Sequence, residues 1–255
     1  MGRDSKETQA LTNERKRLVW LDIGTHRGQE FRSVFAGDVR FALKLLKFFR
    51  RRRRHATLAA SVMEARDLFY FRRILKSRRQ DLFFIAVEAN PFILAHPVYE
   101  MADAIFPLAL GQREADTSSL GRLYLVERDK GGQGSSIFTE KPNVNAADFL
   151  PCIVMDPQRF LTDLKDLLDV HPWDYDLMLR INCEGAEDEV IYAGREVFGD
   201  KLAHVFGSLK DVEEIKGAEA YGALMAFLEK ERLPFTFFSS DVESWPDSHK
   251  VLATL

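Results

Sequence analysis

Short apolar runs alternate with stretches of helical periodicity along most of this 255-residue chain. Such alternation is typical of an α/β protein whose mostly parallel sheet carries helices on both faces. The length suits one large core, so we expect a single domain over 1–255. We expect strands at 18–23, 81–91, 104–111, 121–129, 176–185, 202–209 and 235–240, helices at 156–170, 185–198 and 217–231, and a loop or hairpin at 112–147.

Composition argues against several classes of protein. The chain has no apolar run of 18 residues. Its first 17 residues are rich in charged side chains and contain no apolar stretch, so we expect neither a spanning helix nor a secretory signal. A cytoplasmic location follows, with peripheral membrane attachment left open. Cys152 and Cys183 stand 31 residues apart and the six histidines lack metal-ligand spacing, so we expect buried thiols and no metal site.

The net charge of −3 is unevenly distributed. Residues 37–80 hold fourteen Lys or Arg against three acids, a local charge of +11, while the remainder carries −14. The stretch RFALKLLKFFRRRRR (40–54) predicts a cationic amphipathic helix, and LFYFRRILKSRR (68–79) repeats its mixture of aromatic and basic residues. The cations are Arg40, Lys44, Lys47, Arg51 and Arg54, beside an apolar stripe of Phe41, Leu45, Phe48 and Phe49.

Two interpretations of this basic segment remain open. Its apolar stripe can pack on the protein's own body, or it can lie on an anionic membrane surface or hold another polyanion. Nucleic acid is the less favoured partner, because no recognised nucleic-acid-binding motif accompanies the cations.

Carboxylates mark the ends of two predicted strands. VWLDIGTHRGQE (19–30) carries Asp22, Gly24 and Gly28, and Glu88 ends the strand at 81–91. Ligands of open parallel sheets bind outside the carboxyl ends of the strands, where an acid can hold the ribose hydroxyls. The spacing D-x-G-x-x-x-G lacks the third glycine of the dinucleotide fingerprint, so it favours a cationic nucleoside such as S-adenosylmethionine. A purely structural turn and a solvated acid are the alternative.

Several motifs together resemble the FkbM-type S-adenosylmethionine-dependent methyltransferases. They are VWLDIGTHRGQE, FIAVEANP, LALGQREADTSSLGRLYL, GSSIF and DLMLRINCEGAEDEVIYAG, in that order, over about 18–240 without 37–80. The resemblance implies a Rossmann-like class I methyltransferase fold and methyl transfer to a hydroxyl of a sugar, glycan or secondary metabolite. It also implies that Asp22, Gly24, Thr25 and Gly28 line the methionine part of the cofactor, that Glu88 and Asn90 hold its ribose and adenine side, and that Ser135 and Ser136 lie near the site. It does not explain residues 37–80, which we interpret as a basic helical insertion into that fold.

One departure from the family concerns the catalytic base. The family usually has Asp at the position of Asn182, and an amide can orient a hydroxyl but cannot accept its proton at neutral pH. Glu184 is therefore the candidate base, with Glu187 in reserve. Alternatively, Glu184 caps the helix that begins near Gly185.

Two classes of function follow. The first is an S-adenosylmethionine-dependent O-methyltransferase. The second is a non-catalytic S-adenosylmethionine-binding or scaffold protein whose basic insertion contacts an anionic partner. The missing third glycine disfavours an NAD-dependent oxidoreductase.

Overall fold

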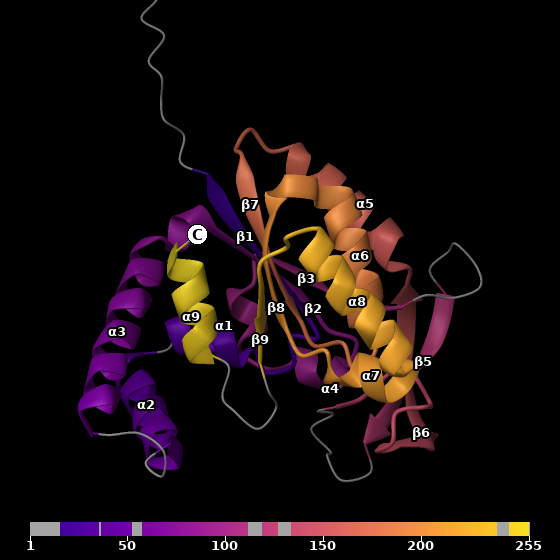
Figure 1. Ribbon diagram of the computed structural model, residues 1–255, viewed down its shortest axis with the longest axis horizontal. Helices are drawn as coiled ribbons and strands as arrows, with labels where there is room; N and C mark the ends of the chain where they lie inside the picture. Colours follow the sequence, from indigo (N-terminus) through magenta and orange to yellow (C-terminus); the bar gives the residue numbers. More distant parts are fainter. Residues whose placement is uncertain are drawn as a thin grey trace, which may run out of the picture.

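A six-stranded parallel sheet forms the centre of the protein (Figure 1), in a computed structural model that describes residues 16–35, 37–52, 58–111, 119–126, 134–238 and 245–254. The strand order is β3-β2-β1-β7-β8-β9, and every neighbouring pair is parallel. The predicted α/β class with a parallel sheet is confirmed. The strands are β1 (Arg17–Ile23), β2 (Leu82–Val87), β3 (Ala104–Phe106), β7 (Tyr175–Ile181), β8 (Leu202–Gly207) and β9 (Phe235–Phe237).

Helices cover both faces of this sheet, because successive strand residues point to opposite sides. Leu21 of β1 packs with the helices of one face, and Trp20 packs with those of the other. The first face is covered by α5 (Pro157–Asp169), α6 (Glu187–Phe198), α7 (Lys210–Lys216) and α8 (Ala218–Lys230). The second is covered by α1 (Gln29–Phe35), α3 (Leu58–Ser77), α4 (Pro91–Leu94) and α9 (Trp245–Thr254).

Helix α5 illustrates how the sequence sets these elements. Asp156 accepts a hydrogen bond from the backbone N–H of Arg159 at 2.9 Å, and Pro157 occupies the first helical position. Its buried residues recur at helical spacing and face the sheet. Three short 3-10 helices, η1 (Arg79–Asp81), η2 (Tyr99–Met101) and η3 (Gly199–Lys201), join other elements.

A second sheet, of order β4-β6-β5, projects from the body. Its strands are β4 (Ala109–Leu110), β5 (Ser119–Val126) and β6 (Val144–Met155), and β5 and β6 form an antiparallel pair. The expected hairpin excursion is therefore present in the described part of 112–147. The prediction of one strand over 104–111 was wrong, because Pro107 separates β3 of the large sheet from β4 of the small one.

Helices α2 (Asp38–Arg52) and α3 lie side by side at one end of the molecule, with α9 beside α3 (Figure 1). Phe41, Leu45, Phe48 and Leu68 form a buried cluster of their own. Arg72 is buried with them, 2.7 Å from Asp38 and over the ring of Phe41. The predicted apolar stripe thus packs on the protein itself. Arg54 lies outside the described residues, as does the side chain of Arg51.

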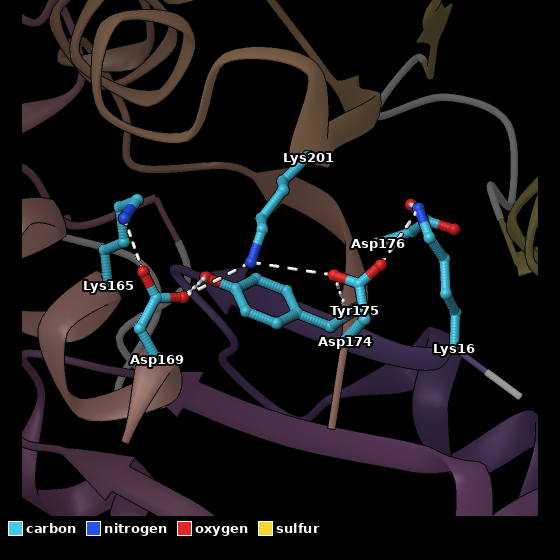
Figure 2. Close-up of polar contacts among 7 residues, drawn as sticks. All are labelled: Lys16, Lys165, Asp169, Asp174, Tyr175, Asp176 and Lys201. Carbon is cyan, nitrogen blue, oxygen red and sulfur yellow. Dashed lines mark hydrogen bonds and ion pairs between the residues drawn. The ribbon is translucent and has the colours of Figure 1, made fainter. Parts of the chain in front are cut away.

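A polar network ties together the amino-terminal edge of the large sheet (Figure 2). Asp169, at the end of α5, accepts hydrogen bonds from the Tyr175 hydroxyl at 3.0 Å and from Lys201 at 3.3 Å. Since ligands of parallel sheets bind at the carboxyl edge, this network anchors elements and is not the candidate site. Its other members are Lys16, Lys165, Asp174 and Asp176.

Candidate functional site

The candidate site lies where the strand order reverses, between the carboxyl ends of β1 and β7. The backbone N–H of Asn182 donates to the carbonyl of Ile23 at 2.9 Å, so the two strands stay paired up to this point. Gly24 follows with φ of +71°, and a Cβ there would overlap the backbone carbonyl of Asn182. Gly24 and Asn182 are both predicted site residues and are 158 positions apart in the sequence. They are in direct contact in the fold.

A buried ion pair supports this junction from one face of the sheet. Asp22 and Arg180 are register neighbours on β1 and β7. The Arg180 guanidinium donates to Asp22 Oδ1 at 3.0 Å and to the carbonyl of Gly24 at 2.8 Å, and it lies 3.7 Å from Glu30. Asp22 is thus fully buried beneath the glycine turn and does not reach the protein surface.

Carboxylates outnumber cations in this buried cluster. Arg180 faces Asp22, Glu30 and, at longer range, Glu88. Burial raises the pKa of Asp22 to about 7, although Arg180 opposes the shift. The sequence analysis missed Arg180, yet an arginine within the apolar run DLMLRI is a visible signal, because a buried charge needs a partner.

Glu88 connects the ends of β1 and β2. Its Oε2 accepts from the N–H of His26 at 2.7 Å, and its Oε1 accepts from the N–H of Asn90 at 2.9 Å. Burial raises the pKa of Glu88, while these two backbone donors oppose the shift. A carboxylate offers about four acceptor positions, more than the backbone donors of His26, Ala89 and Asn90 use, so Glu88 can still accept from a ligand hydroxyl.

The remaining predicted cofactor residues on this side shape the two loops. Thr25 is buried and donates through its hydroxyl to the carbonyl of Asp22 at 2.7 Å. Gly28 has φ of +49°, and a Cβ there would clash with Val98. Asn90 caps α4 by accepting from the N–H of Phe92 at 3.0 Å. These contacts explain the three residues structurally, whether or not a ligand binds.

The E-G-A-E turn after β7 is held by Glu187. Its two carboxylate oxygens accept from the N–H groups of Glu184 at 2.7 Å and Gly185 at 2.8 Å. The alternative in which Glu184 caps α6 was wrong, because the Glu184 side chain points to other partners and Glu187 accepts from the turn. Glu187 is fully buried, and this burial raises its pKa to about 7.

Glu184 lies in a compact polar group next to Asn182. Its Oε1 accepts from the Asn182 amide at 3.2 Å, and its Oε2 contacts the ammonium of Lys141. Lys141 is itself buried and lies 3.1 Å from Asp211. Glu184 is also one of the few described non-glycine residues with positive φ, at +60°, a strained conformation that is common at functional sites.

Ser136 joins this group from the segment between β5 and β6. Its hydroxyl donates to the carbonyl of Glu184 at 2.7 Å and accepts from the N–H of Phe138 at 3.1 Å. Ser135 precedes it and is half-buried. The structure therefore brings Ser136, Asn182 and Glu184 together. The sequence analysis missed Lys141 and Asp211, for which no motif provides a signal.

Comparisons of the chain with protein-family models, with curated proteins and with solved structures yield no match. Among the described residues, no group of three or more His, Cys, Asp or Glu side chains is arranged to hold a metal ion, and no disulfide joins Cys152 to Cys183. None of the helices in the described ranges has both the length and the apolar character needed to cross a membrane.

Proposed function

We propose that this protein is an S-adenosylmethionine-dependent O-methyltransferase that acts on a hydroxyl of a sugar, glycan or secondary metabolite. The observation that carries the proposal is Glu88. It ends β2 beside the point where strand order reverses, and it is hydrogen-bonded to the loop that follows β1. An acid in this place is suited to hold the two hydroxyls of a ribose.

Electrostatics favours a cationic nucleoside over a dinucleotide. Asp22, Glu30 and Glu88 surround the single guanidinium of Arg180, so the junction has an excess of acid. That excess attracts a sulfonium and repels a pyrophosphate. The strand order is also usual among dinucleotide-binding sheets, which makes NAD the natural comparison ligand in a binding test.

On the acceptor side, Asn182 and Glu184 are the proposed catalytic residues. The Asn182 amide would orient the acceptor hydroxyl, and Glu184 would take its proton as the methyl group is transferred. Lys141 contacts the same carboxylate and would fix its direction, so we assign it a positioning role. Each Glu184 oxygen already has one partner, and the second lone pair is the one left for the acceptor.

The contact with Lys141 also favours the second candidate, a non-catalytic S-adenosylmethionine-binding or scaffold protein. A carboxylate held by an ammonium is a weaker proton acceptor than one without such a partner. Under this alternative the group around Glu184 only shapes the turn.

Methyl transfer from isotope-labelled S-adenosylmethionine into a panel of hydroxylated glycans, lipids and metabolites tests the first proposal. Glu184→Gln should lower turnover by about 10²–10⁴-fold, the usual contribution of a general base, while cofactor affinity stays within a few fold. Asp163→Asn, an exposed change on α5, is the matched control. Cofactor binding without transfer to any acceptor would support the scaffold alternative, and full turnover in a folded Glu184→Gln variant would exclude this residue as the base.

A further inference from the structure

The α2–α3 hairpin exposes a second apolar face that the buried stripe does not use. Phe41, Leu45 and Phe48 point inward from α2. On the opposite side of the same helix, Val39, Leu43 and Leu46 are 76%, 61% and 67% exposed. Their spacing of four and three residues places them in one row along the helix. Large apolar side chains in a row on the surface of a folded protein indicate an interaction site.

Helix α3 also exposes large apolar side chains. Val62 and Tyr70 are exposed, on the side of the helix away from the buried Leu68 and Leu75, while the ring of Phe69 packs on Phe41 of α2. Exposed cations alternate with the apolar side chains on both helices; they are Arg40, Lys47 and Arg50 of α2 and Arg66, Arg73 and Lys76 of α3. We call this surface, formed by the exposed residues named here and in the preceding paragraph, the outer face of the hairpin. It lies at the end of the molecule away from the small sheet (Figure 1).

We propose that the outer face of the hairpin binds an anionic membrane surface. The two helices hold ten Lys or Arg against three acids. Apolar side chains between cations match the two parts of such a surface, because the cations meet lipid headgroups while Leu and Val enter the boundary with the acyl chains. The remainder of the protein outside 37–80 is acidic, at −14, and is repelled by the same surface. Within the described part of the chain, the hairpin is therefore the element whose charge favours approach to the bilayer.

The positive charge and the exposed apolar side chains of the outer face together favour an anionic membrane surface over two other partners. A symmetric contact between two copies of the chain would bring one strongly basic hairpin against another, and like charges oppose that contact. A nucleic acid would engage the cations but would leave the row of Val39, Leu43 and Leu46 in water. Only an anionic lipid surface uses both features.

Sedimentation with vesicles tests the proposal on the full chain. At low salt the protein should pellet with vesicles of phosphatidylcholine and phosphatidylserine, and it should stay in the supernatant with phosphatidylcholine alone. Binding should weaken as salt rises, since the Debye length falls to about 3 Å at 1 M. Lys47→Gln combined with Arg50→Gln and Arg73→Gln should lower the partition coefficient roughly a hundredfold, while Lys230→Gln, an exposed change on α8, should not.

A separate pair of substitutions tests how much the exposed apolar side chains contribute to vesicle binding. Leu43→Gln combined with Leu46→Gln should lower vesicle binding at least about tenfold, given the transfer free energy of a leucine side chain. Leu167→Gln on α5, where the leucine is 60% exposed, is the matched control and should bind as the unmodified protein does. All these positions are on the surface, so thermal melts should show that every variant is folded.

Three results would overturn the proposal. The first is absence of the protein from pellets of anionic vesicles at low salt. The second is pelleting that both sets of variants leave unchanged. The third is tight binding to a single-stranded RNA polymer that the Leu43→Gln and Leu46→Gln changes do not affect, together with no vesicle binding, which would identify a nucleic-acid surface. None of these outcomes bears on methyl transfer, so this proposal and the proposed function fail independently.

Discussion

At the scale of single residues, Gly24 carries two separate constraints. Its φ of +71° is unfavourable for any side chain, and a Cβ would also overlap the carbonyl of Asn182. Gly217 shares only the first constraint, because its φ is +89° and no atom lies within 4 Å of a Cβ placed there. Gly217→Ala should therefore cost about 1–3 kcal/mol of unfolding free energy from backbone strain alone. Gly24→Ala should cost about 2–6 kcal/mol, because steric overlap adds to strain.

Urea unfolding of the two alanine variants measures the difference. Equal losses of stability would mean that β1 and β7 can separate at no cost, contrary to the tight junction described above. The Gly24→Ala variant should also bind S-adenosylmethionine more weakly than Gly217→Ala, because it moves the loop that holds Glu88.

The raised pKa of Glu187 predicts how the stability of the protein depends on pH. Its pKa is about 7 in the folded protein, whereas a glutamate in an unfolded chain has a pKa of about 4.3, so the folded state binds the extra proton between these values. The contribution of this group to stability should be full below about pH 4.5 and should be lost as the pH rises from there to about 7, a loss of about 3 kcal/mol. Asp211 and Lys141 face Glu187 and act in opposite directions on its pKa. Glu187→Gln should flatten this part of the profile of unfolding free energy against pH, and an unchanged profile would contradict the assignment.

Some residues of the candidate site can be predicted from the sequence, and others cannot. Gly24, Glu88 and Asn182 lie at or near the carboxyl ends of predicted strands, and parallel strands bring these ends to one edge, so their proximity was predictable. Lys141 was not, because it sits in an irregular segment and meets Glu184 only through tertiary packing. Asp22 shows the converse limit. Its place at a strand end indicated a ligand contact, but alternation within β1 turns it toward Arg180.

At the scale of elements, apolar periodicity located the buried strands but not every strand. Strand β6 was not predicted because residues 144–149 are largely exposed and rich in Ala, Asn and Asp, which are depleted in strands, and because Pro151 interrupts its second half. Helix α2 shows a different limit. Apolar residues occupy both of its sides, so the pattern alone cannot say which row packs on the protein. Only the positions of α3 and α9 decide that Phe41 points inward.

The burial of one side of α2 predicts that substitutions on its two sides have different effects on stability. Phe41→Ala removes a ring that packs on Phe69, on His249 of α9 and on the Arg72 guanidinium. It should lower the unfolding free energy by about 3–5 kcal/mol, as buried Phe-to-Ala changes usually do. Leu46→Ala, on the exposed side of the same helix, should change it by no more than about 0.5 kcal/mol. Chemical denaturation compares the two, and equal effects would mean that α2 does not pack as described.

At the scale of the whole molecule, ligand binding and global stability are coupled. A ligand that binds only the folded state at a hundred times its Kd adds about 2.7 kcal/mol of stability. For a chain of this length that corresponds to a rise in Tm of about 5–10 °C. S-adenosylmethionine should give a rise of this size if it binds at the junction of β1, β2 and β7, and NAD should give none, because the acidic cluster repels its pyrophosphate.

Glu88→Ala should reduce that rise to about half or less, because losing a charged hydrogen-bond acceptor costs about 1.5–3 kcal/mol of binding. The variant also removes the acceptor of the His26 and Asn90 backbone donors, so its Tm without ligand should fall as well. Each ligand-induced rise must therefore be measured from the variant's own Tm. Glu100→Ala, an exposed acid in η2, is the control and should keep the full rise. A rise with NAD and none with S-adenosylmethionine would reject the proposed cofactor, whereas an unchanged rise in Glu88→Ala would reject only the proposed ribose contact.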